Sequence, residues 1–198
     1  MKKTVLATLM CLASTFAGAT TITFDDLNQF QGVANGYQGL NWNGFTIIDT
    51  TQYASSGYVN GVVSKNNVAF TYESYGSFST VGTFAFNSVY LTSAWNNGAN
   101  VVVTGSLAGK DLYARTLTLG TAAPTLETFD WTGIDKVRFA VSGGTPAGYN
   151  GGGSFLAFDN LTVNEAPHGD VPEPGSLALL ALGVAGLACM GRRKQHQG

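Results

Sequence analysis

Apolar residues in the middle of the chain recur at every second position, which is the period of a β-strand and not of a helix. Between residues 136 and 142, valine and phenylalanine alternate with lysine and arginine, as expected for a strand with one buried face. The same period predicts further strands at 21–24, 44–49, 68–72, 84–91, 101–103, 117–119 and 154–163. The middle of the chain is therefore predicted to be all-β.

Turn-forming residues separate these strands. The clearest turn signals are Asn96-Asn97-Gly98, Ala108-Gly109-Lys110, Thr132-Gly133 and the glycine-rich tract 143–153. Eight to ten short strands with this spacing predict an antiparallel β-sandwich over residues 20–166, with a jelly-roll arrangement favoured. The tract 143–153 is too irregular for a phosphate-binding loop and is expected to be a long flexible loop.

The N-terminal residues 1–19 differ in composition from the middle of the chain. Two lysines precede an apolar run from 5 to 16, and Ala17-Gly18-Ala19 follows it. This order of charged, apolar and small residues predicts a signal peptide, with a short buried helix as the alternative. We expect export by the Sec machinery and cleavage by signal peptidase after Ala19, which makes Thr20 the first mature residue.

The C-terminal residues have a composition of their own. A linker at 167–174 ends in Val171-Pro172-Glu173-Pro174, whose prolines fix φ and remove amide donors. The uncharged residues 175–191 predict a single transmembrane helix near the lower length limit. A basic tail, 192–198, begins with Arg192-Arg193-Lys194 and should stay cytoplasmic, which places the preceding domain outside the membrane.

These C-terminal parts together resemble the PEP-CTERM protein-sorting signal, over residues 171–194. The resemblance implies that an exosortase, a membrane cysteine protease, recognises the chain and processes it near Pro-Glu-Pro. It also implies a host that makes exopolysaccharide or biofilm, and an anchor that holds the chain in the inner membrane only transiently. A plain C-terminal membrane anchor is the alternative.

The predicted domain contains neither cysteine nor histidine, because Cys11, Cys189, His168 and His196 all lie outside it. This excludes disulfides, catalysis by a serine–histidine–aspartate triad and zinc held by histidine or cysteine. Acidic residues outnumber basic ones in the domain, so it lacks the excess of positive charge that is typical of nucleic-acid-binding domains.

A carboxylate pair is the remaining route to hydrolysis. Glu73 and Glu127 are the only glutamates between residues 20 and 160, and their spacing singles out no acid–base pair. We therefore expect a non-catalytic domain, with a secreted glycoside hydrolase as an alternative.

Two predicted strands shift their apolar phase by one residue at an acidic dipeptide. The shifts occur at Asp25-Asp26 and at Asp159-Asn160, and each predicts a β-bulge. Bulges re-aim side chains and carbonyls, and aspartate with backbone carbonyls suits calcium. These carboxylates could instead cap turns or pair with Arg138 or Lys136.

The two phase-shifted segments, FDDL at 24–27 and FDNLTV at 158–163, also resemble the first and last strands of galactose-binding-like jelly rolls found in carbohydrate-binding modules. The resemblance implies that the two segments are neighbours. It also implies a structural calcium near Asp159, with Asp25 or Asp26 as a further ligand.

Aromatic residues in loop-like stretches are the candidates for ligand binding. Trp42, Trp95, Tyr58 and Tyr149 lie in stretches rich in glycine, asparagine and serine. Exposed rings stack on the apolar faces of sugars, whereas the alternative is packing inside the domain, as expected for Trp131. The sequence predicts an exported surface or matrix protein associated with exopolysaccharide or biofilm; a carbohydrate-binding module with a defined sugar site is the alternative.

Overall fold

The structure is a computed structural model that describes residues 18–165. The predicted linker, transmembrane helix and basic tail, and residues 1–17 of the predicted signal peptide, lie outside the described residues. No helix within 18–165 is long and apolar enough to cross a membrane. The elements are β1 (Thr20–Ile22), η1 (Tyr37–Gly39), β2 (Asn41–Asn43), β3 (Phe45–Asp49), η2 (Thr50–Gln52), α1 (Gly57–Asn60), β4 (Asn67–Thr71), β5 (Tyr75–Ser93), β6 (Asn96–Asn97), β7 (Ala99–Leu107), β8 (Lys110–Leu119), β9 (Thr125–Ser142), β10 (Thr145–Pro146) and β11 (Leu156–Val163).

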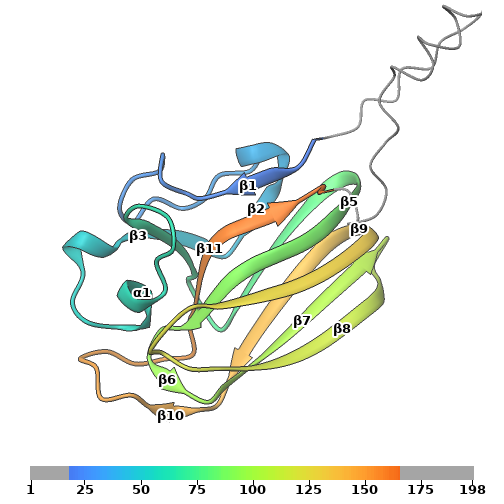
Figure 1. Cartoon of the computed structure of the whole chain (residues 1–198). Helices are drawn as coiled ribbons and strands as arrows, with labels where there is room; N and C mark the ends of the chain where they lie inside the picture. The colour runs from blue at the N-terminus through green and yellow to red at the C-terminus, as the bar shows by residue number, and fades with distance from the viewer. Residues whose placement is uncertain (1–17, 166–198) are drawn as a thin grey trace, which may run out of the picture. The chain divides into compact units, whose positions relative to one another are not determined.

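The strands pair in the order β3-β4-β11-β5-β9-β7-β8, with β1 on β11 and β2 on β5, and every pairing is antiparallel. Figure 1 shows how the long strands β5 and β9 pass from one side of the domain to the other. One layer contains β2, β7, β8, the first part of β5 and the last part of β9. The other contains β3, β4, β11 and the remaining parts of β5 and β9. The predicted antiparallel β-sandwich is confirmed.

Bulges allow β5 and β9 to join both layers. The pairing changes from Phe84↔Ile134 to Phe86↔Trp131, so β9 carries one extra residue at the point where Gly133 has φ 68°. Extra residues in one strand bend it and increase its twist. The prediction of a turn at Thr132-Gly133 was therefore wrong, because these residues lie inside a bent strand of 18 residues.

Aromatic rings fill the space between the layers. Phe139 of β9 meets Phe158 of β11 edge to face, with ring centroids 4.7 Å apart. Phe158 in turn meets Phe45 of β3 at 4.9 Å. Val137 and Val141 are buried beside Phe139, so the alternation predicted for 136–142 is confirmed. Burying such side chains stabilises the fold by about 1.5–3 kcal/mol each.

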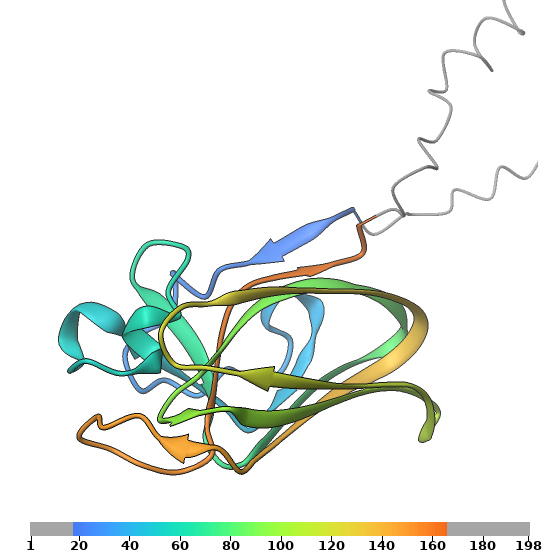
Figure 2. The ribbon, with the colours of Figure 1, turned by 60° about the horizontal axis from the view of Figure 1, so that its bottom comes forward.

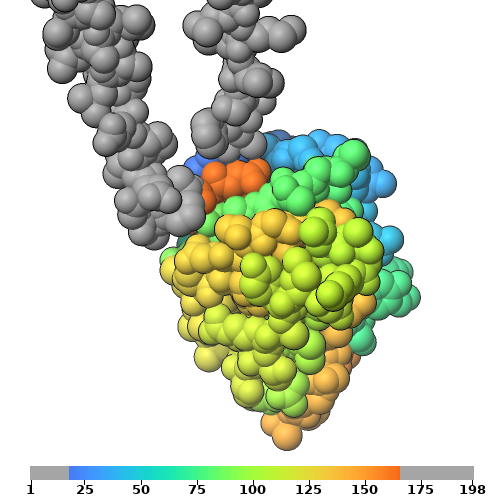
Figure 3. All heavy atoms as spheres, turned by 90° about the vertical axis from the view of Figure 1, so that its right-hand side faces the viewer, coloured from blue at the N-terminus to red at the C-terminus, as the bar shows by residue number. Residues whose placement is uncertain are grey.

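The first and last strands are neighbours, as predicted. Thr20 pairs with Val163 and Ile22 with Leu161, so the two ends of the described domain meet at one edge (Figures 2 and 3). In β11 the pairing passes from Asp159↔Tyr90 to Thr162↔Ser88, which is the one-residue bulge that the sequence predicted.

The other predicted bulge was wrong. β1 ends at Ile22, and Phe24 adopts φ 61° at the start of a turn, so the chain leaves the sheet before Asp25. The sequence pattern also missed β2 and the first part of β9, and it expected only short strands.

Candidate functional site

A second group of apolar side chains lies on the outer face of the layer formed by β3, β4 and β11. Strand residues point alternately to the two faces of a sheet. Ile48, Val68 and Ala157 therefore point away from the main core and pack with Tyr58 and Trp95. This group supports the candidate site.

Tyr58 and Trp95 are held together by the segments that carry them. Tyr58 lies on α1, whose first turn is capped by the hydroxyl of Ser56, and the Gly57 N–H donates to the Ala94 carbonyl at 2.8 Å. A side chain at Gly57 would collide with the Ser93 backbone, so only glycine allows this approach. The rings of Tyr58 and Trp95 meet edge to face at 5.3 Å.

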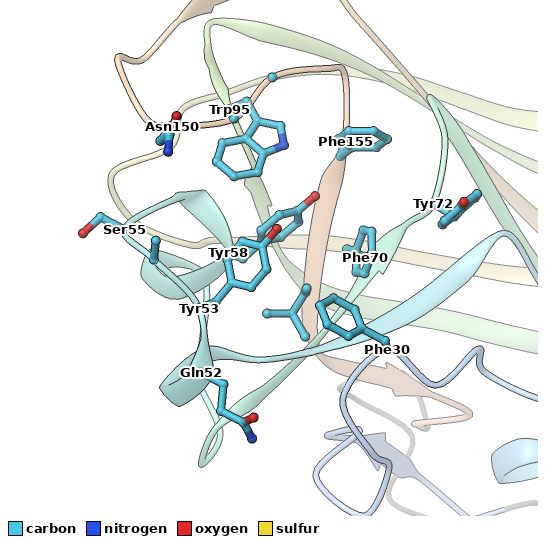
Figure 4. Close-up of a pocket in the computed structure, with 14 residues that line it drawn as sticks. Phe30, Gln52, Tyr53, Ser55, Tyr58, Phe70, Tyr72, Trp95, Asn150 and Phe155 are labelled. Carbon is cyan, nitrogen blue, oxygen red and sulfur yellow. The ribbon is translucent and has the colours of Figure 1, made fainter.

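The outer surface of this group forms a hollow of about 700 Å³, which we call the aromatic hollow. Figure 4 shows aromatic rings from separate segments around it. Tyr58 is buried at its base, whereas Phe30 and Tyr72 keep 63% and 66% of their surface exposed. Its lining residues are Phe30, Ile48, Gln52, Tyr53, Ala54, Ser55, Tyr58, Phe70, Tyr72, Trp95, Asn150, Gly151, Gly152 and Phe155.

The lining of the aromatic hollow is apolar and uncharged, with a few polar groups. Gln52, Ser55 and Asn150 supply amide and hydroxyl groups that both donate and accept hydrogen bonds. Burial raises the pKa of the Tyr58 hydroxyl, so this group is neutral at physiological pH. The hollow therefore offers ring faces and neutral hydrogen-bonding groups to a ligand.

Glycine residues of the loop between β10 and β11 complete the wall beside Trp95. A Cβ atom at Gly151 would overlap the indole ring, whereas one at Gly152 would meet nothing within 4 Å. The tract predicted as a long flexible loop thus packs against the aromatic hollow at Gly151. Close approach of the backbone to the indole requires glycine at that position.

Of the residues predicted to bind a ligand, two lie in the aromatic hollow, at its base and wall. These are Tyr58 and Trp95. Tyr149 packs on the same apolar group without lining the hollow, and its hydroxyl accepts a hydrogen bond from the Asn60 amide at 2.9 Å.

Trp42 requires a correction. Its ring lies 5.3 Å from both Phe45 and Phe78 and packs in the main core, and the residue is 5% exposed and lies outside the aromatic hollow. Trp131 is also buried in the core, as expected.

Sequence reasoning missed the two most exposed rings, Phe30 and Tyr72. Phe30 stands alone among polar residues at 28–31, which is a weak signal for an exposed aromatic. Tyr72 lies one residue beyond the end of β4 and continues the alternation of Val68 and Phe70. The alternation therefore predicts a residue on the same face of the strand as these two. Only the position of the strand end reveals its exposure.

The three aspartates of the predicted calcium site contact hydrogen-bond donors. Asp159 is fully buried, and its carboxylate accepts hydrogen bonds from the N–H groups of Val63, Ser64 and Asn160 and from the Ser64 hydroxyl. Burial raises the pKa of Asp159, and these donors partly offset that rise.

Asp25 and Asp26 have partners of their own. Asp25 accepts from the N–H groups of Asn66 and Asn67, and Asp26 accepts from the Tyr37 hydroxyl at 2.6 Å. No three histidine, cysteine or acidic side chains converge within residues 18–165. These hydrogen bonds compete with the binding of a calcium ion, which takes six to eight oxygen ligands, backbone carbonyls included, and the calcium site stays a prediction.

The comparisons with solved structures find carbohydrate-binding modules at low identity. A family 61 module in complex with β-1,4-galactotriose is 10% identical, covering 69% of this chain and 98% of that one, with a TM-score of 0.38. A family 29 module is 15% identical, covering 79% and 99%, with a TM-score of 0.39. A family 51 module from Clostridium perfringens in complex with methyl-galactose is 12% identical, covering 73% and 99%, with a TM-score of 0.34. A search of curated proteins finds no match.

The comparison with protein families identifies the C-terminal segment. Residues 170–194 match the PEP-CTERM protein-sorting motif. The match includes the Val171-Pro172-Glu173-Pro174 segment and the basic residues Arg192, Arg193 and Lys194. The chain thus carries a PEP-CTERM sorting motif, which indicates an exported protein that is sorted to the cell surface.

Proposed function

We propose that the described domain is a non-catalytic carbohydrate-binding domain, displayed at the cell surface and associated with exopolysaccharide or biofilm. The observation that supports this function is the aromatic hollow, in which exposed rings from distant parts of the chain surround an uncharged surface. Sugar rings have C–H groups on their faces and hydroxyls at their edges. Aromatic rings and neutral polar groups complement these two surfaces.

The positions of the two exposed rings support a role in binding a ligand and not in packing inside the domain. Phe30 precedes β2, and Tyr72 follows β4, yet both line the same hollow. Exposed large apolar residues that are gathered and rimmed by polar groups are typical of ligand-binding surfaces. The uncharged lining favours a neutral sugar unit.

The arrangement of carboxylates favours binding without hydrolysis. Glycoside hydrolysis requires two carboxyl groups that flank the scissile bond. The aromatic hollow is lined by no carboxylate. Glu127 forms an ion pair with Arg115 at 2.8 Å, and Glu73 is an exposed residue outside the lining of the hollow. The alternative of a secreted hydrolase finds no support in these positions.

The proposed route to the surface uses the two ends of the chain. Signal peptidase is expected to cleave after Ala19, which is exposed directly before β1, and the exosortase near Pro172-Glu173-Pro174. Residues 175–191 are then a transient membrane anchor. Mass spectrometry of the protein recovered from an exosortase-bearing host tests this route. We expect a mature chain that begins at Thr20 and lacks the basic tail, and retention of that tail would contradict exosortase processing.

The binding proposal is tested on the two exposed rings. We expect affinity for neutral polysaccharides, including that of an exopolysaccharide-producing host, to fall roughly two- to tenfold in Phe30→Ala and in Tyr72→Ala, because each loses one stacking surface. Val81→Ala is the matched control, since Val81 is 99% exposed and lies outside the hollow. Unchanged binding in both ring variants, measured by calorimetry, would refute the assignment of this surface.

A further inference from the structure

A second hollow, of about 450 Å³, lies on the outer face of the other layer, and we call it the basic groove. It differs in chemistry from the aromatic hollow, because its lining is mainly polar and includes two cations. No residue lines both. The groove is lined by Asn35, Asn41, Trp42, Asn43, Tyr75, Ser77, Ser79, Lys136 and Arg138.

Strand pairing places the two cations on one face. Lys136 pairs with Ser79, and Arg138 pairs with Ser77. Residues directly opposite each other in an antiparallel pair point to the same face. The residue between the cations, Val137, is fully buried, which confirms that Lys136 and Arg138 point outward.

Asparagine side chains extend the same rows onto β2. Asn41 pairs with Ser79, and Asn43 pairs with Ser77, so each cation stands in a row with one serine and one asparagine. The basic groove therefore combines positive charge with amide and hydroxyl groups. Such groups match the carboxylate and the hydroxyls of a uronate sugar.

The charges of the groove are only partly neutralised. Residues 18–165 contain five basic residues, and two of them lie here although the domain is acidic overall. Lys136 forms no ion pair within the described part of the chain. Arg138 faces one acid, Asp111 of β8, at 4.0 Å, and both side chains are more than half exposed. A guanidinium this accessible is free to bind a carboxylate through two parallel hydrogen bonds.

One short segment of the chain carries residues of both hollows. Tyr72 lines the aromatic hollow, and Tyr75, which is 49% exposed, lines the basic groove. Only two residues separate them in the chain.

We propose that the basic groove binds carboxylate groups of an acidic polysaccharide. The inference deepens the proposed function, because it names the class of polymer whose neutral units the aromatic hollow would contact. The groove supplies the charge selectivity that the uncharged aromatic hollow lacks.

The test compares polygalacturonate with its methyl ester, which keeps the sugar chain and removes the charge. We expect the wild-type domain to bind polygalacturonate more tightly, and Lys136→Gln/Arg138→Gln to lose roughly two- to fivefold in affinity per charge removed. Affinity for the ester should be unchanged. Lys65→Gln, which removes an exposed charge outside the groove, is the control and should bind like the wild type.

A variant that should bind more tightly and a salt titration complete the test. Asp111→Asn frees Arg138 and should increase affinity for polygalacturonate. Raising the salt from about 0.01 M to about 0.15 M shortens the screening length from about 30 Å to about 8 Å, and should weaken binding of the acid but not of the ester. Dextran sulfate shows whether the groove prefers carboxylates, and tighter binding of the sulfated polymer would overturn that assignment.

The proposals for the basic groove and for the aromatic hollow can be refuted independently of each other. Equal binding of polygalacturonate and its ester, or an unchanged double variant, would overturn the basic groove. If Phe30→Ala and Tyr72→Ala keep full affinity while the charge variants lose theirs, the aromatic hollow is refuted and the groove stands.

Discussion

Asp159 on β11 accepts two hydrogen bonds from Ser64, one from its N–H at 2.7 Å and one from its hydroxyl at 2.8 Å. The two residues are 95 positions apart in the chain. The contact joins the bulge of β11 to the loop before β4. Both strands belong to the layer beneath the aromatic hollow. A buried carboxylate that accepts hydrogen bonds from several N–H groups holds the segments that carry these groups in place.

We expect Asp159→Asn to lower the free energy of unfolding by about 1–3 kcal/mol, because an amide replaces one acceptor oxygen by a donor that faces other donors. Chemical denaturation measures the change. Asp26→Asn is the matched control: Asp26 is exposed and its one hydrogen bond, from Tyr37, survives in the amide. The free energy of unfolding of that control should lie within about 0.5 kcal/mol of the wild-type value. An equally small effect of Asp159→Asn would contradict the structural role of Asp159.

Calcium should leave the melting temperature of the mature domain unchanged. Asp25, Asp26 and Asp159 already accept hydrogen bonds from protein donors, and a cation would have to displace them. Thermal unfolding with added calcium and with a chelator measures this. A higher melting temperature in calcium would restore the calcium site predicted from the phase-shifted strands.

Gly151→Ala should reshape the wall of the aromatic hollow. The added methyl group overlaps the indole of Trp95, so the ring or the loop must move, at a cost of about 1–3 kcal/mol for overpacking. Tryptophan fluorescence and sugar affinity should both change. Gly152→Ala adds the same methyl group to open space one residue further along the loop and should change neither; equal effects of the two substitutions would show that the indole contact is unimportant.

Ala108→Asn should stabilise the turn between β7 and β8. Ala108 and Gly109 both have positive φ, 50° and 80°, as in a type I′ turn, where asparagine followed by glycine is favoured. We expect a gain of about 0.5–1 kcal/mol, because asparagine tolerates this conformation better than alanine. Ala114→Asn, at an exposed position within β8, should give no gain, and thermal unfolding distinguishes the two. A loss of stability at 108 would contradict the turn assignment.

The sequence by itself determined the fold class and the destination of this protein. Alternation along 136–142 requires a strand with one buried face, because side chains of a strand alternate strictly between its two sides. The sorting motif is likewise read from a contiguous segment, since Pro172-Glu173-Pro174, an uncharged stretch and three basic residues are local features.

Only the tertiary structure decided which aromatic residues line the aromatic hollow. Trp42 and Trp95 occupy similar polar stretches, yet Trp42 packs between Phe45 and Phe78, while Trp95 lies beside an open hollow. The difference arises because β5 and β9 bend through bulges and fold one sheet into two layers. Whether a ring faces the space between the layers or the outside depends on contacts between residues far apart in the chain, which a local pattern does not contain.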